Sequence, residues 1–189
     1  MTMQQVWQAQ LQEFAQEHKI NESGQTFLQI YYEDVDSEDL STVPMADLVA
    51  AARSHQQTAS RPRLPSQAHI EILQQGQDAE FAANETVINI VFDDMPFLID
   101  SLILLLNRHR TQQHDVKMNL KLLVHPIFTI KRNEQGELQN WSRSRSTDNG
   151  RESWVQIRLD LLPDNIAARL KADIENMLAT LYKVVNDEG

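Results

Sequence analysis

A change in hydrophobic period at residue 67 constrains the fold of this chain more than any other feature. Upstream of it, apolar residues recur at helical spacing, whereas downstream they alternate with polar residues over short runs. Alternation with a period of two is typical of strands, because successive side chains point to opposite faces of a sheet. The segments predicted as strands are QAHIEILQ (67–74), ETVINIVFD (85–93), KMNLKLLVHPIFTIKR (117–132), LQNW (138–141) and ESWVQIRLDLL (152–162).

Two segments between and after these strands return to helical spacing. One follows Pro96, and the other spans 163–185 with its apolar residues on one stripe. Pro126 removes a ladder donor inside 117–132, so we expect an edge position or a bulge there. A doubly wound parallel fold would need more regular alternation of strands and helices. The sequence therefore predicts an α+β fold, with an antiparallel sheet and two helices packed on one of its faces.

The first third of the chain is predicted to be mainly helical. Residues 3–18 form an amphipathic pattern, and Pro44 opens a second, alanine-rich helix that runs to residue 60. The short segment TFLQIYY, 26–32, is rich in β-prone residues and favours a strand. RPRLP, 61–65, reads as an extended connector because each proline disfavours helix in the residue before it. We predict a helical N-terminal region and linker at 1–64 and an α+β domain at 65–189.

Charge and composition narrow the range of partners. The formal net charge of −10 repels phosphate backbones and anionic lipids, so neither nucleic acid nor a membrane is an expected partner. The longest uninterrupted apolar run, Leu102–Leu106, is far shorter than the ~20 residues of a membrane span. The chain has no cysteine and its N-terminus does not resemble a signal peptide, so we expect a cytoplasmic protein.

The segment FDDMPFLID, 92–100, concentrates acidic residues at a predicted strand-to-helix turn. In the first interpretation, Asp94 caps the helix and Asp93 adds charge near the positive end of its dipole. In the second, the carboxylates form a metal or acid–base site, although they lack the spacing of a calcium loop. In the third, the turn binds a regulatory ligand. The residues of this candidate ligand turn are Asp93, Asp94, Met95, Pro96, Phe97 and Asp100.

The histidines give little support to the metal interpretation. His109 and His114 are five residues apart near a predicted helix end, where a histidine is more often a partner of the helix dipole. His125 precedes Pro126 within a predicted strand, and we expect it to be packed or hydrogen-bonded in the sheet. We predict no metal ligand and no catalytic residue in this chain.

Three ordered motifs resemble one protein family. They are VINIVFDDMPFLIDSL, LLVHPIFTIKRNEQGEL and RESWVQIRLDLLPD, and the upstream segment DLVAAARSH adds to the likeness. The pattern, over residues 27–165, resembles the amino-terminal, ACT-like region of the large NAD-specific glutamate dehydrogenases of bacteria. This resemblance implies a regulatory or assembly segment of an enzyme that oxidatively deaminates L-glutamate to 2-oxoglutarate with NAD. The catalytic region of that family lies far downstream, and the expected partners are other domains or subunits of the parent enzyme.

The chain departs from the generic ACT pattern in two places. Ligand-binding members usually carry glycine just after the proline of the first strand-to-helix turn, where this sequence has Phe97. The fourth strand that ends the ACT order has no counterpart after Val185, so either segment 67–74 fills that edge or the strand lies beyond residue 189. No G-x-G-x-x-G turn occurs, and we expect no bound cofactor here and NAD in the parent enzyme. The alternative function is a free-standing ACT-type module that binds a small amino acid.

Overall fold

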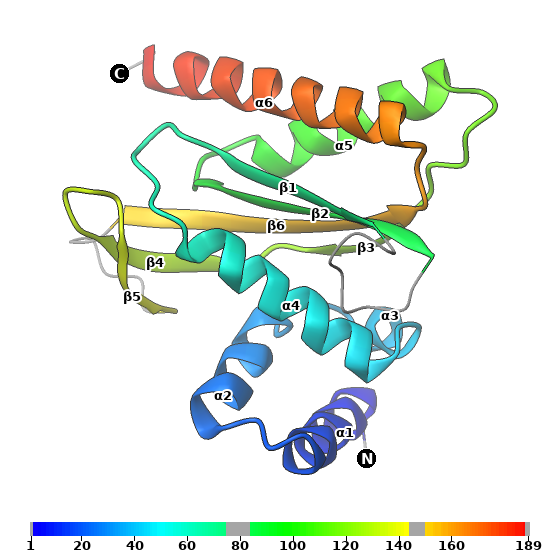
Figure 1. The fold of residues 1–189 in the computed structure, drawn as a ribbon, viewed down its shortest axis with the longest axis vertical. Helices are drawn as coiled ribbons and strands as arrows, with labels where there is room; N and C mark the ends of the chain where they lie inside the picture. Colours follow the sequence, from blue (N-terminus) through cyan, green and yellow to red (C-terminus); the bar gives the residue numbers. More distant parts are fainter. Residues whose placement is uncertain (1, 75–83, 144–149, 188–189) are drawn as a thin grey trace.

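A computed structural model describes residues 2–74, 84–143 and 150–187 of the chain. In these ranges a sheet of six antiparallel strands separates two groups of helices (Figure 1). The elements in chain order are α1 (Met3–Glu17), α2 (Glu22–Tyr31), α3 (Ser37–Ser41), α4 (Met45–Ser60), β1 (His69–Gln74), β2 (Glu85–Asp93), α5 (Leu98–Gln112), β3 (Leu120–Val124), β4 (Ile127–Arg132), β5 (Leu138–Ser142), β6 (Gly150–Asp160) and α6 (Asp164–Asp187).

The sheet has the order β1-β2-β6-β4-β5, and β3 pairs with β6 beside β4. The long β2 and β6 form its centre, where Ile88 pairs with Ile157 and Ile90 with Val155. Strands β3 and β4 run along the same side of β6 and are separated by His125 and Pro126, so the segment predicted as one strand at 117–132 is divided into two at Pro126. The ladder continues across this break, because the amide of Trp154 donates to the Pro126 carbonyl over 3.0 Å.

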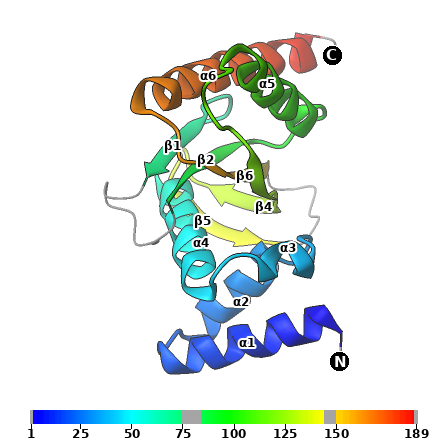
Figure 2. The same cartoon turned by 90° about the vertical axis from the view of Figure 1, so that its right-hand side faces the viewer.

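Helices α5 and α6 cover one face of the sheet (Figure 2), which confirms the predicted α+β architecture. Their apolar stripes pack on aliphatic side chains of β2 and β6, including Ile88, Ile90 and Ile157. Strand β1 pairs with β2 and forms an edge of the sheet. Segment 67–74 therefore occupies a sheet edge, as the first of the two alternatives for the closing strand requires. No helix within the described ranges is both long and apolar enough to cross a bilayer.

The other sheet face is covered by the N-terminal helices, with α4 lying directly on the sheet and α1 and α2 farther out (Figure 1). Their core is aromatic, and the ring centroids of Phe128 and Trp154 lie 4.5 Å apart. This core joins side chains of the helices to side chains of the sheet. The division of the chain into 1–64 and 65–189 remains a prediction.

The strand predicted at 26–32 is wrong, because most of this segment lies in helix α2. The Asn21 side chain caps the helix by accepting from the Gly24 amide at 2.8 Å. Phe27, Leu28 and Tyr31 are then buried, and the Phe27 ring reaches the rings of Phe128 and Trp154 on the sheet. Strand propensity is weak compared with the burial of three large side chains, so the tertiary contacts decide the helix.

Candidate functional site

The predicted ligand turn lies where β2 leaves the sheet and leads into α5. Asp93 is the last residue of β2 and pairs with Glu152 of β6 in the strand ladder. Its carboxylate accepts from the Arg63 guanidinium at 2.7 Å and from the Ser66 amide at 2.7 Å. Asp93 therefore ties the 61–67 connector to the sheet, and both of its oxygens have partners.

Asp94 does not cap the helix, so this part of the first interpretation is wrong. It accepts from the Ser153 hydroxyl at 2.8 Å and forms an ion pair with Arg151 at 3.2 Å. The N-cap of α5 is Phe97, three residues later, and no side-chain hydrogen bond caps the helix. The ladder between β2 and β6 continues to Asp93, which holds Asp94 beside Ser153 before the chain can turn into the helix.

The rest of the turn is apolar and strained. Phe97 has a φ of 66°, a left-handed conformation that is rare for a bulky residue, yet its side chain is 66% exposed. Met95 packs against the core beneath α5 and α6. Asp100 is exposed in the first turn of α5, where its charge favours the helix dipole. Asp93 and Asp94 are thus held by neighbouring segments, Met95 packs against the core, and the other three residues of the turn are exposed. The assignment of these six residues as a ligand turn remains a prediction.

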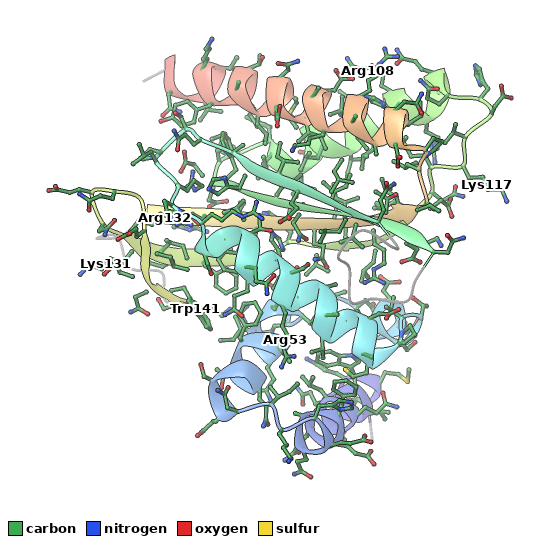
Figure 3. The ribbon with its side chains drawn as sticks, in the orientation of Figure 1. Arg53, Arg108, Lys117, Lys131, Arg132 and Trp141 are labelled. Carbon is green, nitrogen blue, oxygen red and sulfur yellow. The ribbon has the colours of Figure 1, made fainter. Side chains whose placement is uncertain are left out.

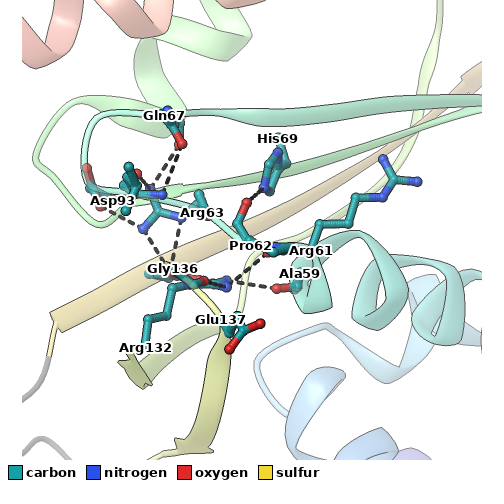
Figure 4. Close-up of polar contacts among 12 residues, drawn as sticks. Ala59, Arg61, Pro62, Arg63, Gln67, His69, Asp93, Arg132, Gly136 and Glu137 are labelled. Carbon is teal, nitrogen blue, oxygen red and sulfur yellow. Dashed lines mark hydrogen bonds and ion pairs between the residues drawn. The ribbon is translucent and has the colours of Figure 1, made fainter. Parts of the chain in front are cut away.

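A buried ionic cluster beside the turn was not anticipated from the sequence, and Figure 4 shows its members Arg63, Asp93 and Arg132. Glu152 accepts from Arg132 at 2.7 Å and from Arg63 at 2.8 Å, and both partners come from other segments of the chain. The cluster is completed by Asp93, so two cations face two anions in a largely dry environment. Burial alone would raise the pKa of Glu152, but the hydrogen bond from Arg132 and the charge of Arg63 outweigh it and hold the pKa below its usual value.

Arg63 is the centre of this cluster. Its guanidinium donates to Glu152, to Asp93 and to the carbonyls of Leu64 and Gln67, so each of its nitrogens has an acceptor. The turn between β4 and β5 also packs on its backbone, because Gly136 at a φ of 82° accepts from the Arg63 amide at 2.9 Å. A Cβ at residue 136 would lie 2.6 Å from the Arg63 carbonyl oxygen, so only glycine fits.

Arg132 links the cluster to the N-terminal helices. Its guanidinium donates to the carbonyls of Ala59 at 2.8 Å and Arg61 at 3.1 Å, at the C-terminal end of α4. A cation there complements the negative end of the helix dipole. The sequence feature that could have revealed this role is the placement of arginines beside conformationally restricted segments: Arg63 lies between two prolines, and Arg132 opens the NEQGE turn.

A small polar pocket of about 130 Å³ lies beside the turn. Its charged residues are Asp34, Arg143 and Arg151, and its walls are completed by Ile30, His125, Pro126, Ile127 and Thr129. Arg143 also forms ion pairs with Glu33 and Asp34 from the end of the α2 region. The pocket thus presents both signs of charge in a space suited to a small zwitterion or a few water molecules.

His125 connects this pocket to the predicted turn. Its Nε2 lies 3.0 Å from the Ser153 hydroxyl, which in turn donates to Asp94. This contact confirms the expectation that His125 is hydrogen-bonded in the sheet. Burial lowers the pKa of His125, and the charges of Asp94 and Asp34 oppose that shift without cancelling it.

The other predicted histidines do not come together as a metal site. His109 is buried in the last turn of α5 and its Nε2 lies 2.7 Å from the Asp173 carboxylate on α6. His114 follows in the turn after α5 and is exposed. Within residues 2–74, 84–143 and 150–187, no three acidic or histidine side chains are grouped so that they could hold a metal ion.

Comparison with known proteins gives one family and one distant relative. Residues 27–174 match the sequence profile described as glutamate dehydrogenase, ACT1 domain. The chain is also 26% identical over 167 residues to the NAD-specific glutamate dehydrogenase of Halomonas elongata. That alignment covers 86% of this chain but only 9% of the relative, so the chain spans a small part of the length of the protein it matches. No solved structure matches the chain.

Proposed function

This chain belongs to the family of glutamate dehydrogenase ACT1 domains, and on that premise we propose that it is a non-catalytic regulatory and assembly segment of a large NAD-specific glutamate dehydrogenase. The parent enzyme oxidatively deaminates L-glutamate to 2-oxoglutarate with NAD in the cytoplasm. The partners of the segment are the other domains or subunits of that enzyme. This proposal extends the resemblance found in the three sequence motifs.

The observation that carries the proposal, beside family membership, is how the acidic turn is used. Asp93 is held by Arg63 and the Ser66 amide, and Asp94 by Ser153 and Arg151. A general base needs a free lone pair directed at a substrate proton, whereas these carboxylates direct theirs at neighbouring segments of the chain. The turn therefore fits the role of a structural joint that positions the helices relative to the sheet.

The described residues do not fit a dinucleotide. A dinucleotide turn needs glycine where the backbone approaches the pyrophosphate at a helix N-terminus. The turn from β2 into α5 carries Phe97 instead, and the turn from β6 into α6 carries Pro163. We propose that NAD is bound by other parts of the parent enzyme.

Turnover assays test the non-catalytic role. We expect the 189-residue chain to reduce no NAD in the presence of glutamate, while the full-length parent does so. In the parent, Asp94→Asn is expected to leave kcat within about twofold, because Asp94 is not at a reaction centre. Turnover by the chain alone that Asp94→Asn abolishes while the variant remains folded would overturn the proposal.

A second candidate function is the binding of a small amino acid in the pocket beside His125. The observation that favours it is the juxtaposition of Arg151 and Arg143 with Asp34, since a zwitterion presents a carboxylate and an ammonium group. Calorimetric titration with glutamate, aspartate and branched-chain amino acids tests it, with Arg151→Gln as the matched variant. We expect weak binding or none; a Kd below about 100 µM that Arg151→Gln abolishes would establish the sensing function instead.

A further inference from the structure

Helix α5 has a second apolar face that points away from the sheet. Its inner face buries Leu98, Leu102, Leu105 and Leu106. On the outer face, Leu104 is 72% exposed and Phe97 is 66% exposed, and these are the two most exposed of the large apolar side chains in the described residues. Leu104 and Thr111 are seven residues apart, the repeat that aligns side chains along one seam of a packed helix, and Phe97 lies directly before the first residue of α5.

A shallow apolar groove runs beside this seam. It has a volume of about 800 Å³ and lies between α5 and α6. Leu104 and Leu105 line it from α5, and Met177, Leu181 and Val184 line it from α6. From Ser101 to Thr111 the α5 wall is about 15 Å long, close to three helical turns. An exposed apolar surface of this extent is typical of an interaction site.

The charges on α5 indicate what lies on this surface. Asp100 and Arg108 are each four residues from Leu104, on opposite sides of it, and Phe97 and Thr111 are each seven residues from it. The sequence of charges is therefore self-complementary about Leu104 when a second α5 runs antiparallel to the first. Both charged side chains are exposed, and neither has an ion-pair partner within the described part of the chain. Arg108 lies on the helical layer at the outer surface of the molecule (Figure 3).

We propose that a second copy of this chain docks on α5 across a two-fold axis that passes close to Leu104. The two α5 helices run antiparallel, Leu104 packs on Leu104 of the second copy, and each Asp100 pairs with Arg108 of the other copy. Such an interface is isologous, so the contact between Asp100 and Arg108 occurs twice. Phe97 reaches toward Thr111 of the second copy and covers the ends of the seam, which gives its exposed side chain a contact.

This inference rests on the assembly role proposed above and names its partner and surface. It is tested on the isolated chain, whereas the non-catalytic role is tested by turnover. Monomeric behaviour of the chain would therefore overturn the dimer and leave the turnover test unaffected. The groove would then accept a different segment of the parent enzyme.

Charge reversal provides the sharpest test, read by sedimentation equilibrium at about 1 to 100 µM protein. We expect the wild type to dimerise and Asp100→Arg or Arg108→Asp alone to raise the dimer Kd roughly tenfold or more, since each places like charges together twice. The double variant D100R/R108D is expected to regain affinity, because the swapped charges again oppose. An equimolar mixture of the two single variants is expected to form heterodimers. A monomeric wild type, unaffected single variants or an unrecovered double variant would each overturn the proposal.

A single introduced cysteine tests the position of the axis. Because the chain contains no cysteine, Leu104→Cys supplies the only thiol, and mild oxidation is expected to link two copies efficiently. Lys131→Cys, exposed on β4 away from the helical layer, is the matched control and is expected to link at least tenfold more slowly (Figure 3). Equal linking rates for the two variants would show that α5 does not lie on a two-fold axis. Circular dichroism confirms that each variant is folded.

Discussion

The two faces of the sheet are packed by different kinds of side chain. On the face of α5 and α6 the core is mainly leucine, isoleucine and valine, with Phe92 as its fully buried aromatic residue. On the face of α4 the core is built around aromatic rings, including those of Phe27, Phe128 and Trp154. Aliphatic packing depends mainly on buried area, whereas aromatic rings also prefer particular mutual orientations.

The two faces of the sheet also differ in the polar contacts that hold their helices. On the α4 face, Tyr31 donates to His55 Nδ1 at 2.7 Å and His55 Nε2 donates to the Ile90 carbonyl at 3.0 Å. The cluster of Arg63, Arg132 and Glu152 fixes the end of α4 to the same sheet. A helix held by directional contacts has fewer alternative docking positions than one held by area alone. The N-terminal helices are therefore oriented by specific contacts, and α5 and α6 by their apolar stripes.

Breaking the ionic cluster is expected to have the largest effect. Glu152→Gln removes the anion shared by Arg63 and Arg132 and leaves Asp93 as the remaining carboxylate of the cluster for two buried cations. We expect a loss of about 3–5 kcal/mol in the free energy of unfolding, measured by urea denaturation. Glu134→Gln, in the exposed turn after β4, is the control and should change stability by less than about 0.5 kcal/mol. A loss below about 1 kcal/mol for Glu152→Gln would mean that the cluster does not hold the two layers together.

A cavity on the aliphatic face is expected to have the next largest effect. Leu102→Ala removes a side chain that is completely buried between α5 and the sheet. The expected loss is about 3 kcal/mol, from lost burial and the cavity left behind. Leu104→Ala is the matched control, since the same residue type two positions along the same helix is 72% exposed. It should change the unfolding free energy of the monomer by less than about 0.5 kcal/mol, and equal effects at the two positions would contradict the assignment of the faces.

Acidification is expected to weaken the α4 face through His55. Burial lowers the pKa of His55 from 6.5 to about 4, although its hydrogen bond to the Ile90 carbonyl opposes the shift. Between these two pH values the unfolded chain binds a proton that the folded chain excludes, so stability is full above pH 6.5 and falls as the pH drops toward 4. At about pH 5 the loss from this residue is about 2 kcal/mol relative to neutral pH.

Denaturation at a series of pH values, for the wild type and for His55→Gln, isolates this effect. The variant has no group titrating at position 55, so its stability is expected to fall less steeply over the same range. His69 and His125, whose pKa values are also lowered, remain in both proteins and cancel in the comparison. Parallel pH profiles would show that His55 is not held neutral by burial.

Removing one hydroxyl group is expected to have the smallest effect. Tyr31→Phe leaves His55 Nδ1 buried without its donor, and we expect a loss of about 1–2 kcal/mol in unfolding free energy. Tyr182→Phe on the other face is the matched control. The Tyr182 ring meets Phe92 edge-on, and no hydrogen bond of its hydroxyl is found within the described residues. Losses of equal size in the two variants would remove the distinction between a polar and an aliphatic face.

The aliphatic half of the fold could be predicted because its pattern is local. The pattern in 85–93 indicates a strand, and the stripe in 163–185 indicates a helix and its buried face, without reference to any other segment. The aromatic half could not be predicted in the same way. Segment 26–32 became helix α2 because its large side chains meet the sheet. Asp94 does not act as the expected cap of α5, because the β2 ladder extends to Asp93 and the helix begins only after Phe97.

The candidate site shows the same division. Its acidic turn stands out in the sequence, but the partners of the turn come from distant segments: Arg63 from the connector, and Arg151 and Ser153 from β6. Contacts over such separations leave no periodic pattern in the sequence. Their residue types alone did not distinguish a buried joint from a ligand site.

The amino-acid sequence by itself determined the α+β order of the second half, the acidic surface and the family, because periodicity, net charge and ordered motifs are properties of the chain. Only the tertiary structure decided that the N-terminal helices share a core with the sheet and that Arg63, Arg132 and Glu152 meet beneath the turn. The physical reason is that a buried charge is stable only beside its counter-charge, and folding alone brings such residues together.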